Sequence, residues 1–232
     1  MSNSTAVIVG VGAGLGASLV RGFSAAGLDV VAVARHAAAR EELAEGADTQ
    51  VTLYDCDTTD PAAVHELFSG LADRSLDVVV YNAGAFAPGP VTDIDAADFE
   101  RCWRVGCFGG FLVGQAAARA MLPSGRGSIV FTGATASLRG GAGFANLASP
   151  KFALRALAQS MARELGPQGI HVAHVIIDGQ IHSERYTHLA DERGPDALLD
   201  PDAIAAAYLA LHRQPRSAWT QEADLRPWSE KF

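Results

Sequence analysis

The chain has 232 residues, of which 49% are hydrophobic and 19% charged, and its formal net charge is −8. A chain of this length can bury the full core of one α/β domain. Phosphate binding needs a concentrated basic face, and no cluster of lysine and arginine is visible in this acidic sequence. We therefore expect a single domain over residues 1–232 and no nucleic-acid partner.

The cysteines and the N-terminus indicate in which cellular compartment the protein is expected. Cys56, Cys102 and Cys107 are an odd number without C-x-x-C spacing, which is typical of reduced thiols in a cytoplasmic protein. Residues 1–5 lack a basic region, and the apolar residues 6–9 are too short for a signal or a membrane span. We expect a cytoplasmic protein without a membrane partner, and we expect no metal site.

Short apolar runs rich in valine or isoleucine alternate with helix-length spacers along the chain. The expected strands are Ala6–Val9, Asp29–Ala34, Val51–Tyr54, Asp77–Tyr81, Ser128–Thr132 and His171–Ile177, with a possible last strand from about Thr220 to Leu225. Long helices are expected over about Ala96–Leu122 and Asn146–Leu165. This alternation predicts a Rossmann-like α/β fold, in which a doubly wound parallel sheet carries helices on both faces and binds ligands at the carboxyl ends of its strands.

One segment lacks this pattern. Residues 179–201 are polar and irregular and include His182, Tyr186 and His188. A segment of this length is typical of a mobile lid or a substrate loop.

A glycine-rich stretch follows the first expected strand and opens a helix. It contains Gly10, Gly12, Gly14, Leu15 and Gly16. Glycine allows the backbone to approach a pyrophosphate closely, and the helix N-terminus offers free N–H groups and the positive end of the helix dipole. The stretch predicts a dinucleotide-binding loop, the alternative being a glycine-rich turn without a ligand.

Further stretches occur in an order that resembles one family. The Gly10-x-x-x-Gly14-x-Gly16 loop, Asp57-Thr58-Thr59-Asp60, Asn82-Ala83-Gly84 and the stretch from Asp178 to Ser183 are similar to successive motifs of the short-chain dehydrogenase/reductase family. Val9 departs from the threonine that usually precedes the loop. The resemblance covers nearly the whole chain.

This resemblance implies several residue roles. Asp57 would meet the adenine edge of the cofactor, and Asn82, Ala83 and Gly84 would lie beside the cofactor. Further along, Gly179, Ile181 and Ser183 would belong to the loop that faces the nicotinamide. The resemblance also implies a homo-oligomer, a dimer or tetramer formed through the long helices.

The residue at the end of the second strand bears on the choice of dinucleotide. NAD sites usually place an acidic side chain there, whereas the guanidinium of Arg35 can pair with a 2′-phosphate. A solvated arginine at a strand end is common, and Ala13 lacks the basic side chain that many NADP-binding relatives carry inside the loop. The sequence favours NADP over NAD.

The family's reaction uses asparagine, serine, tyrosine and lysine, and the resemblance assigns these positions here. Lys151 is kept, but Leu147 stands at the tyrosine position, Ala134 at the serine position and Gly106 at the asparagine position. We expect the usual proton chemistry to be lost while Lys151 still binds the ribose. The alternative is that Lys151 is an exposed helix lysine.

Other residues could donate the proton in place of the tyrosine, although none of them belongs to a family motif. Tyr186 on the expected lid and Thr135 beside Ala134 are the first candidates, ahead of His182, His188 and Asn146. His174 is also titratable, whereas Cys107 fits a core residue better than a nucleophile. A positioned acid contributes about 10²–10⁴ in rate, so a cationic or conjugated substrate, such as an iminium or an activated alkene, suits this site better than a ketone.

Three functions follow from these observations. The first is an atypical NADP-dependent oxidoreductase that acts on a small organic substrate without the tyrosine acid. The second is a non-catalytic dinucleotide-binding sensor or partner protein. The third is a cofactor-independent isomerase or lyase on the same fold. Contacts to the nicotinamide through Ile181 and Ser183 favour the first.

Overall fold

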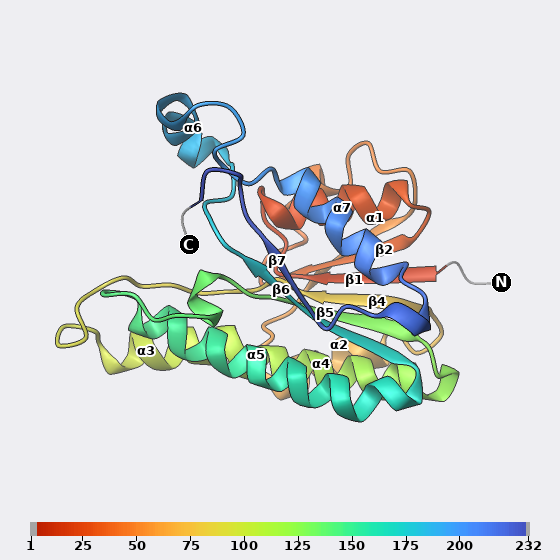
Figure 1. Ribbon diagram of the computed structural model, residues 1–232. Coiled ribbons are helices and arrows are strands. Elements are labelled where there is room, and N and C mark those ends of the chain that lie inside the picture. The colour runs from red at the N-terminus through yellow and green to blue at the C-terminus, as the bar shows by residue number, and fades with distance from the viewer. Residues whose placement is uncertain (1–3, 231–232) are drawn as a thin grey trace.

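Seven parallel strands form one sheet at the centre of the molecule, in the order β3-β2-β1-β4-β5-β6-β7 (Figure 1). The structure is a computed structural model and describes residues 4–230. The strands are β1 (Ser4–Val9), β2 (Asp29–Ala34), β3 (Val51–Asp55), β4 (Ser75–Tyr81), β5 (Gly127–Thr132), β6 (Ile170–Ile177) and β7 (Glu222–Leu225). The doubly wound α/β fold predicted from the sequence is confirmed. The strand order reverses between β1 and β4, where such sheets bind their ligands.

Helices cover both faces of the sheet. On one face lie α1 (Leu15–Ala25) and α7 (Pro201–His212), and on the other lie α2 (Pro61–Ser69), α4 (Gly109–Met121) and α5 (Ala145–Leu165) (Figure 1). Because neither face meets water, the central strands are mostly apolar, and all eight residues of β6 are buried. Because both faces of the sheet are covered, most strands could be predicted from their apolar runs in the sequence.

The long helix after β4 is not uniform. The sequence predicts one helix over about Ala96–Leu122, whereas the structure has α3 (Ala96–Trp103), a π-helical turn η2 (Arg104–Phe108) and then α4. By length and apolar composition alone, the run Ala96–Ser124 is able to cross a membrane. It packs on the sheet instead, since a side chain at Gly110 would meet Leu154 and Tyr81. π turns inside helices often mark functional sites.

The segment expected to be irregular contains regular structure. Within residues 179–201, a short turn η6 (Glu184–Tyr186) leads into the helix α6 (Thr187–Arg193), which protrudes beyond the carboxyl end of the sheet (Figure 1). The two ends of the segment are joined, because the His182 N–H donates to Leu199 O at 2.8 Å. The interpretation of this segment as a lid or substrate loop stays a prediction.

The last strand forms as the sequence suggested, though it is shorter. β7 pairs in parallel with β6, from His174 beside Glu222 to Ile177 beside Leu225. Trp228 after it is 81% exposed and does not pack onto this chain. Phe232 lies outside the described residues.

Short 3-10 turns complete the described chain. They are η1 (Glu41–Leu43), η3 (Leu122–Ser124), η4 (Thr135–Ser137), η5 (Gly166–Gln168) and η7 (Arg216–Ala218). Two of them position the site, since η1 follows the end of β2 and η4 follows the end of β5.

Candidate nucleotide-binding and active site

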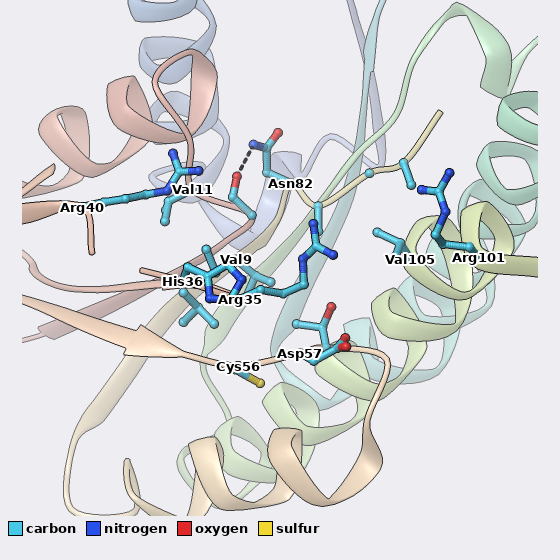
Figure 2. A pocket seen from close by; sticks show the side chains of 17 residues that line it. Val9, Val11, Arg35, His36, Arg40, Cys56, Asp57, Asn82, Arg101 and Val105 are labelled. Atoms are coloured by element: carbon cyan, nitrogen blue, oxygen red, sulfur yellow. Dashed lines mark hydrogen bonds between the residues drawn. The ribbon is translucent and has the colours of Figure 1, made fainter. Parts of the chain in front are cut away.

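A cavity of about 340 Å³ lies at the carboxyl ends of β1, β2, β3 and β4 (Figure 2). Of the residues expected to bind a cofactor, it brings together Gly10, Arg35, Asp57, Asn82, Ala83 and Gly84. These residues come from four separate strand ends, so the fold alone assembles them. The cavity corresponds to the adenosine end of the expected site.

The glycine loop packs tightly against the rest of the chain at Gly10 and Gly16 and faces open space at Gly12 and Gly14. A Cβ at Gly10, where φ is +90°, would lie 2.4 Å from the Ala83 nitrogen, and one at Gly16 would lie 2.6 Å from the Val11 Cα. By contrast, a Cβ at Gly14 would meet nothing within 4 Å, and one at Gly12 would meet only Arg40 Nη1, at 3.9 Å. The loop therefore has backbone packed against the sheet on one side and open space on the other, which fits a pyrophosphate.

Helix α1 begins at this loop without a side-chain cap. Gly14 is its N-cap residue, and its first turn carries no acidic residue. The Ala17 N–H already donates to Gly12 O at 2.9 Å, whereas the earlier N–H groups of the helix and the helix dipole favour an anion there. Leu15 and Gly16, the first residues of α1, are buried against the core and supply backbone rather than side-chain groups.

Asn82 ties this loop to the end of β4. Its Nδ2 donates to Gly10 O at 3.1 Å, and its backbone N–H donates to Val9 O at 2.8 Å (Figure 2). A side-chain amide is suited to this task because it continues the strand pairing where the backbone ladder stops. The asparagine fixes the shape of the site.

Asp57 lies in the cavity with part of its carboxylate already engaged. Its Oδ1 accepts hydrogen bonds from the Thr59 N–H and from Thr59 Oγ1, both at 2.9 Å. The backbone bond from Thr59 is the main cause that lowers the pKa of Asp57, and the positive charge of Arg35 adds to it. The carboxylate is thus held ionised and oriented at the edge of the cavity.

Two arginines line the cavity near the end of β2. Arg35 was expected, whereas Arg40 was not, and Figure 2 shows Arg40 beside Val11 of the glycine loop. Within residues 4–230, neither guanidinium forms an ion pair with a carboxylate of the chain. The sequence did not predict Arg40, because no motif surrounds it. The turn that brings Arg40 toward the glycine loop forms only in the folded chain.

Lys151 is buried, so the alternative of an exposed helix lysine is wrong. Its Nζ donates to the backbone oxygen of Thr132 at 2.6 Å, and the residue is 6% exposed. No carboxylate in the described part of the chain pairs with it. Burial without a counter-charge lowers the pKa of Lys151 to about 8.

The positions assigned to serine and tyrosine lie near this lysine in the chain. Ala134 follows the end of β5, and its N–H donates to Ser137 Oγ at 3.1 Å. Leu147, in the first turn of α5, is half-buried, and its N–H donates to Phe144 O at 3.0 Å. Neither side chain carries a group that can donate or accept a proton.

Gly106 in the π turn faces a proline of α5. A Cβ at Gly106 would lie 2.8 Å from Pro150 Cβ and 3.1 Å from Pro150 Cγ. Pro150 stands inside α5, where it lacks the N–H that a helix normally uses. The proline ring therefore occupies the space that a side chain at position 106 requires, and the two residues fit each other as a pair.

This fit predicts a stability effect at Gly106. Gly106→Ala should lower the free energy of unfolding by about 1–3 kcal/mol, because the added methyl overpacks against Pro150. Pro150→Gly, which removes both the Cβ and the Cγ that the methyl would meet, should remove that penalty when the two changes are combined. Urea unfolding of both variants tests this, with Gly22→Ala as the matched control, since a Cβ at Gly22 would lie 3.5 Å from Ala205 Cβ in ordinary contact. Additive effects of the two substitutions would contradict the pairing.

Thr135 and Tyr186, the two candidate replacement acids, have different surroundings. Thr135 Oγ1 donates to Asp178 Oδ1 at 2.5 Å, at the ends of β5 and β6. Tyr186 is half-buried in the protruding segment, with the Arg185 guanidinium 5.4 Å from its ring centre. Neither residue lines the cavity. Thr135 is therefore fixed at the carboxyl end of the sheet, whereas Tyr186 lies on the protrusion.

Two other candidates are buried in the interior. His174 is completely buried, with Ser137 Oγ 3.4 Å from its Nε2 and Glu222 Oε2 3.4 Å from its Nδ1, and burial lowers its pKa. Cys107 is buried in the core, where burial raises the pKa of its thiol. All three cysteines are free and buried, as the sequence indicated.

The residues expected at the nicotinamide lie outside the cavity. Gly179 has a φ of +143° and packs against Pro227, and Ile181 forms a bridge with Leu199. Ser183, which is half-buried, precedes η6. They belong to the loop after β6, beside Asp178 rather than beside the adenosine end.

The fold and the cavity define a nucleotide-binding α/β protein, and comparison with known proteins narrows the class. A family model described as short chain dehydrogenase matches residues 4–192. The chain belongs to the short-chain dehydrogenase/reductase family.

Individual relatives agree with this assignment. A short-chain dehydrogenase structure from Rhodopseudomonas palustris is 39% identical, with a TM-score of 0.84, and the match covers 98% of this chain and 100% of that one. A metagenomic short-chain oxidoreductase in complex with NADP is 27% identical, with a TM-score of 0.81 and 97% of each chain covered. (+)-Borneol dehydrogenase 1 of Salvia officinalis is 29% identical over 90% of this chain and 87% of its own length.

Proposed function

We propose that this protein is an NADP-dependent oxidoreductase that transfers hydride to or from a small organic substrate without a tyrosine acid. The observation that carries the proposal is a cavity lined by Gly10 of the glycine loop and by two arginines, in a chain that also keeps a buried lysine at position 151 and a leucine at the tyrosine position. The nicotinamide, when bound, supplies the hydride chemistry. The chain's own residues bind and orient the reactants.

Charge supports NADP over NAD at the adenosine end. A 2′-phosphate carries about two negative charges, and guanidinium groups bind phosphate through charge-assisted hydrogen bonds. Arg35 and Arg40 both line the cavity, in a chain whose net charge is −8. A local positive site in an acidic protein favours the cofactor with the extra phosphate.

Lys151 is the retained member of the family's catalytic set. Its ammonium is fixed by Thr132 O and has further N–H groups that are suited to ribose hydroxyls. With Leu147 and Ala134 beside it, the site holds no hydroxyl at the two positions that normally move the proton. A substrate that accepts hydride without simultaneous protonation by the enzyme fits this arrangement best.

The rival function is a dinucleotide sensor that binds NADP without turnover. Nicotinamide fluorescence measures NADPH and NADH binding, and the absorbance at 340 nm follows turnover with panels of imines, enones and ketones. We expect NADPH binding and oxidation by imines or enones, with ketones inert. Binding without any turnover would favour the sensor, and turnover that needs no nucleotide would favour an isomerase or lyase. Absence of nucleotide binding would contradict both the oxidoreductase and the sensor.

The arginine pair gives a specific prediction for cofactor preference. Arg35→Ala and Arg40→Ala should each weaken NADPH binding by about 10–100-fold, because each removes a charge-assisted hydrogen bond to phosphate. NADH binding should change by less than about three-fold. Fluorescence titration of both nucleotides measures the ratio. Arg126→Ala is the control, since Arg126 pairs with Asp77 outside this cavity. Equal losses for NADPH and NADH would show that neither arginine reads the 2′-phosphate.

We also propose that the chain acts in the cytoplasm, without a membrane partner, as a homo-oligomer formed through α3, α4 and α5. Aromatic side chains are exposed along this surface, among them Trp103 at 40%, Phe111 at 38% and Phe152 at 43%. Trp103 and Phe111 both stack on Phe108, at 6.2 and 6.5 Å between ring centres. Such a patch is typical of an interface. Light scattering of the purified protein tests for the dimer or tetramer, and a monomer at micromolar concentration would exclude it.

A further inference from the structure

The Thr135 hydroxyl is committed as a hydrogen-bond donor. It lies directly after Ala134, at the carboxyl end of β5, and donates to Asp178 Oδ1 at 2.5 Å. Asp178 is 4% exposed and stands directly after β6. Because the single hydroxyl hydrogen is used by a carboxylate, the remaining capacity of Thr135 Oγ1 is that of an acceptor.

The charges around this pair favour a cation. Asp178 pairs with Arg226 at 3.4 Å, and Arg226 also pairs with Asp224. Glu230 Oε2 is 3.5 Å from the position that a Cβ would take at Gly179, the residue after Asp178. In this cluster the carboxylates of Asp178, Asp224 and Glu230 outnumber the guanidinium of Arg226. A neutral carbonyl gains nothing from this surplus, whereas a positively charged group does.

An aromatic surface lies on the loops that follow β4 and precede α5. Phe86 and Phe144 stack with their ring centres 4.9 Å apart, and they are 41% and 42% exposed. Phe86 follows the Asn82-Ala83-Gly84 stretch and Phe144 precedes Leu147, and their loops are joined by the Gly89 N–H, which donates to Gly143 O at 3.1 Å. Exposed aromatic faces attract apolar groups and cations. The surface suits a ring-bearing cation.

We propose that Thr135 and Asp178 select substrates with a protonated C=N group, whose N–H donates to the Thr135 oxygen. This inference rests on the proposed function and narrows its substrate class to cyclic or aryl-substituted iminium ions. Hydride adds to the iminium carbon, the π pair of C=N becomes the lone pair of the amine nitrogen, and NADPH becomes NADP⁺. The amine then takes a proton from water, so no enzyme acid is consumed.

Binding of a product analogue tests the selection apart from turnover. Calorimetry of the NADP⁺-loaded protein compares 2-phenylpyrrolidine, which is a cation with N–H donors at pH 7, with 2-phenylcyclopentanone, a neutral acceptor. We expect the amine to bind at least about 10-fold more tightly. Thr135→Val and Asp178→Asn should each reduce that preference by about 10-fold, whereas Thr135→Ser should keep it.

Asp77→Asn is the matched control, because it removes a carboxylate that pairs with Arg126 near the start of β4 and does not contact Thr135. It should keep at least a third of the amine preference. Should Asp178→Asn fail to fold, the near-isosteric Thr135→Val carries the test. A ketone that binds as tightly as the amine, or a Thr135→Val protein with unchanged preference, would overturn the inference. If NADPH binds and enones are reduced without any amine preference, only this inference fails, whereas loss of NADPH binding would defeat the proposed function itself.

Discussion

Replacing Ala134 with serine and Leu147 with tyrosine together should raise kcat/KM for ketone reduction by about 10²–10⁴-fold, or about 3–5 kcal/mol of barrier. The physical reason is that the ammonium of the buried Lys151, four residues further along α5, would lower the pKa of a phenol at position 147. The two hydroxyl groups would supply the donor and the acid that the present residues lack. NADPH oxidation at 340 nm with a panel of aryl ketones measures the gain.

The matched control is Ala134→Ser combined with Leu147→Phe, which adds the same ring without the phenolic hydroxyl. It should leave ketone reduction at the level of the unmodified protein. An equal gain in both double variants would mean that bulk rather than the acid limits the reaction. No gain in the tyrosine variant, in a protein that still binds NADPH, would contradict the placement of Leu147 in the active site.

Lys151 should make the stability of the nucleotide-free protein rise with pH. Burial lowers its pKa to about 8 in the folded protein, against 10.5 for an unperturbed lysine. Between these values the unfolded chain binds more protons than the folded one, so the free energy of unfolding increases as pH rises through the window. The full increment is about 3 kcal/mol, present above pH 10.5 and lost as pH falls through 8.

The measurement compares urea unfolding of the unmodified protein and Lys151→Met from pH 7 to 10.5. The difference between the two profiles should change by about 3 kcal/mol in favour of the unmodified protein. The chain has two lysines, Lys151 and Lys231, so carbon NMR of lysine labelled at Cε resolves the titration directly. Parallel stability profiles, or a Lys151 signal that titrates above pH 10, would contradict a buried and unpaired ammonium. Lys151→Met should also weaken NADPH binding if the lysine holds the ribose.

Features with a local signature were predictable from the sequence. The buried strands appear as valine-rich runs because both faces of a parallel sheet are covered, and even β7 could be located. The glycine loop was visible because its backbone has to pack against Ala83 on one side and stay open on the other. Local spacing therefore predicted the fold and six of the residues that line the cavity.

Features that depend on distant contacts were not predictable in the same way. Arg40 reaches the cavity through a turn without a motif, and the contact between Gly106 and Pro150 joins two helices. The pairing of Thr135 with Asp178 depends on the alignment of β5 with β6. The one local signal of the contact between the two helices was Pro150, because a proline inside a helical pattern is unusual.

Deuterium transfer to product tests the central claim most directly, namely that hydride chemistry persists with leucine at position 147. The unmodified protein is incubated with NADPH deuterated at C4 of the nicotinamide and with a mixture of cyclic imines, enones and ketones, and the products are analysed by mass spectrometry. We expect one deuterium in the product of an imine or enone and none in any alcohol. Tight NADPH binding with no deuterium in any product would contradict hydride transfer and leave a nucleotide-binding protein without redox chemistry.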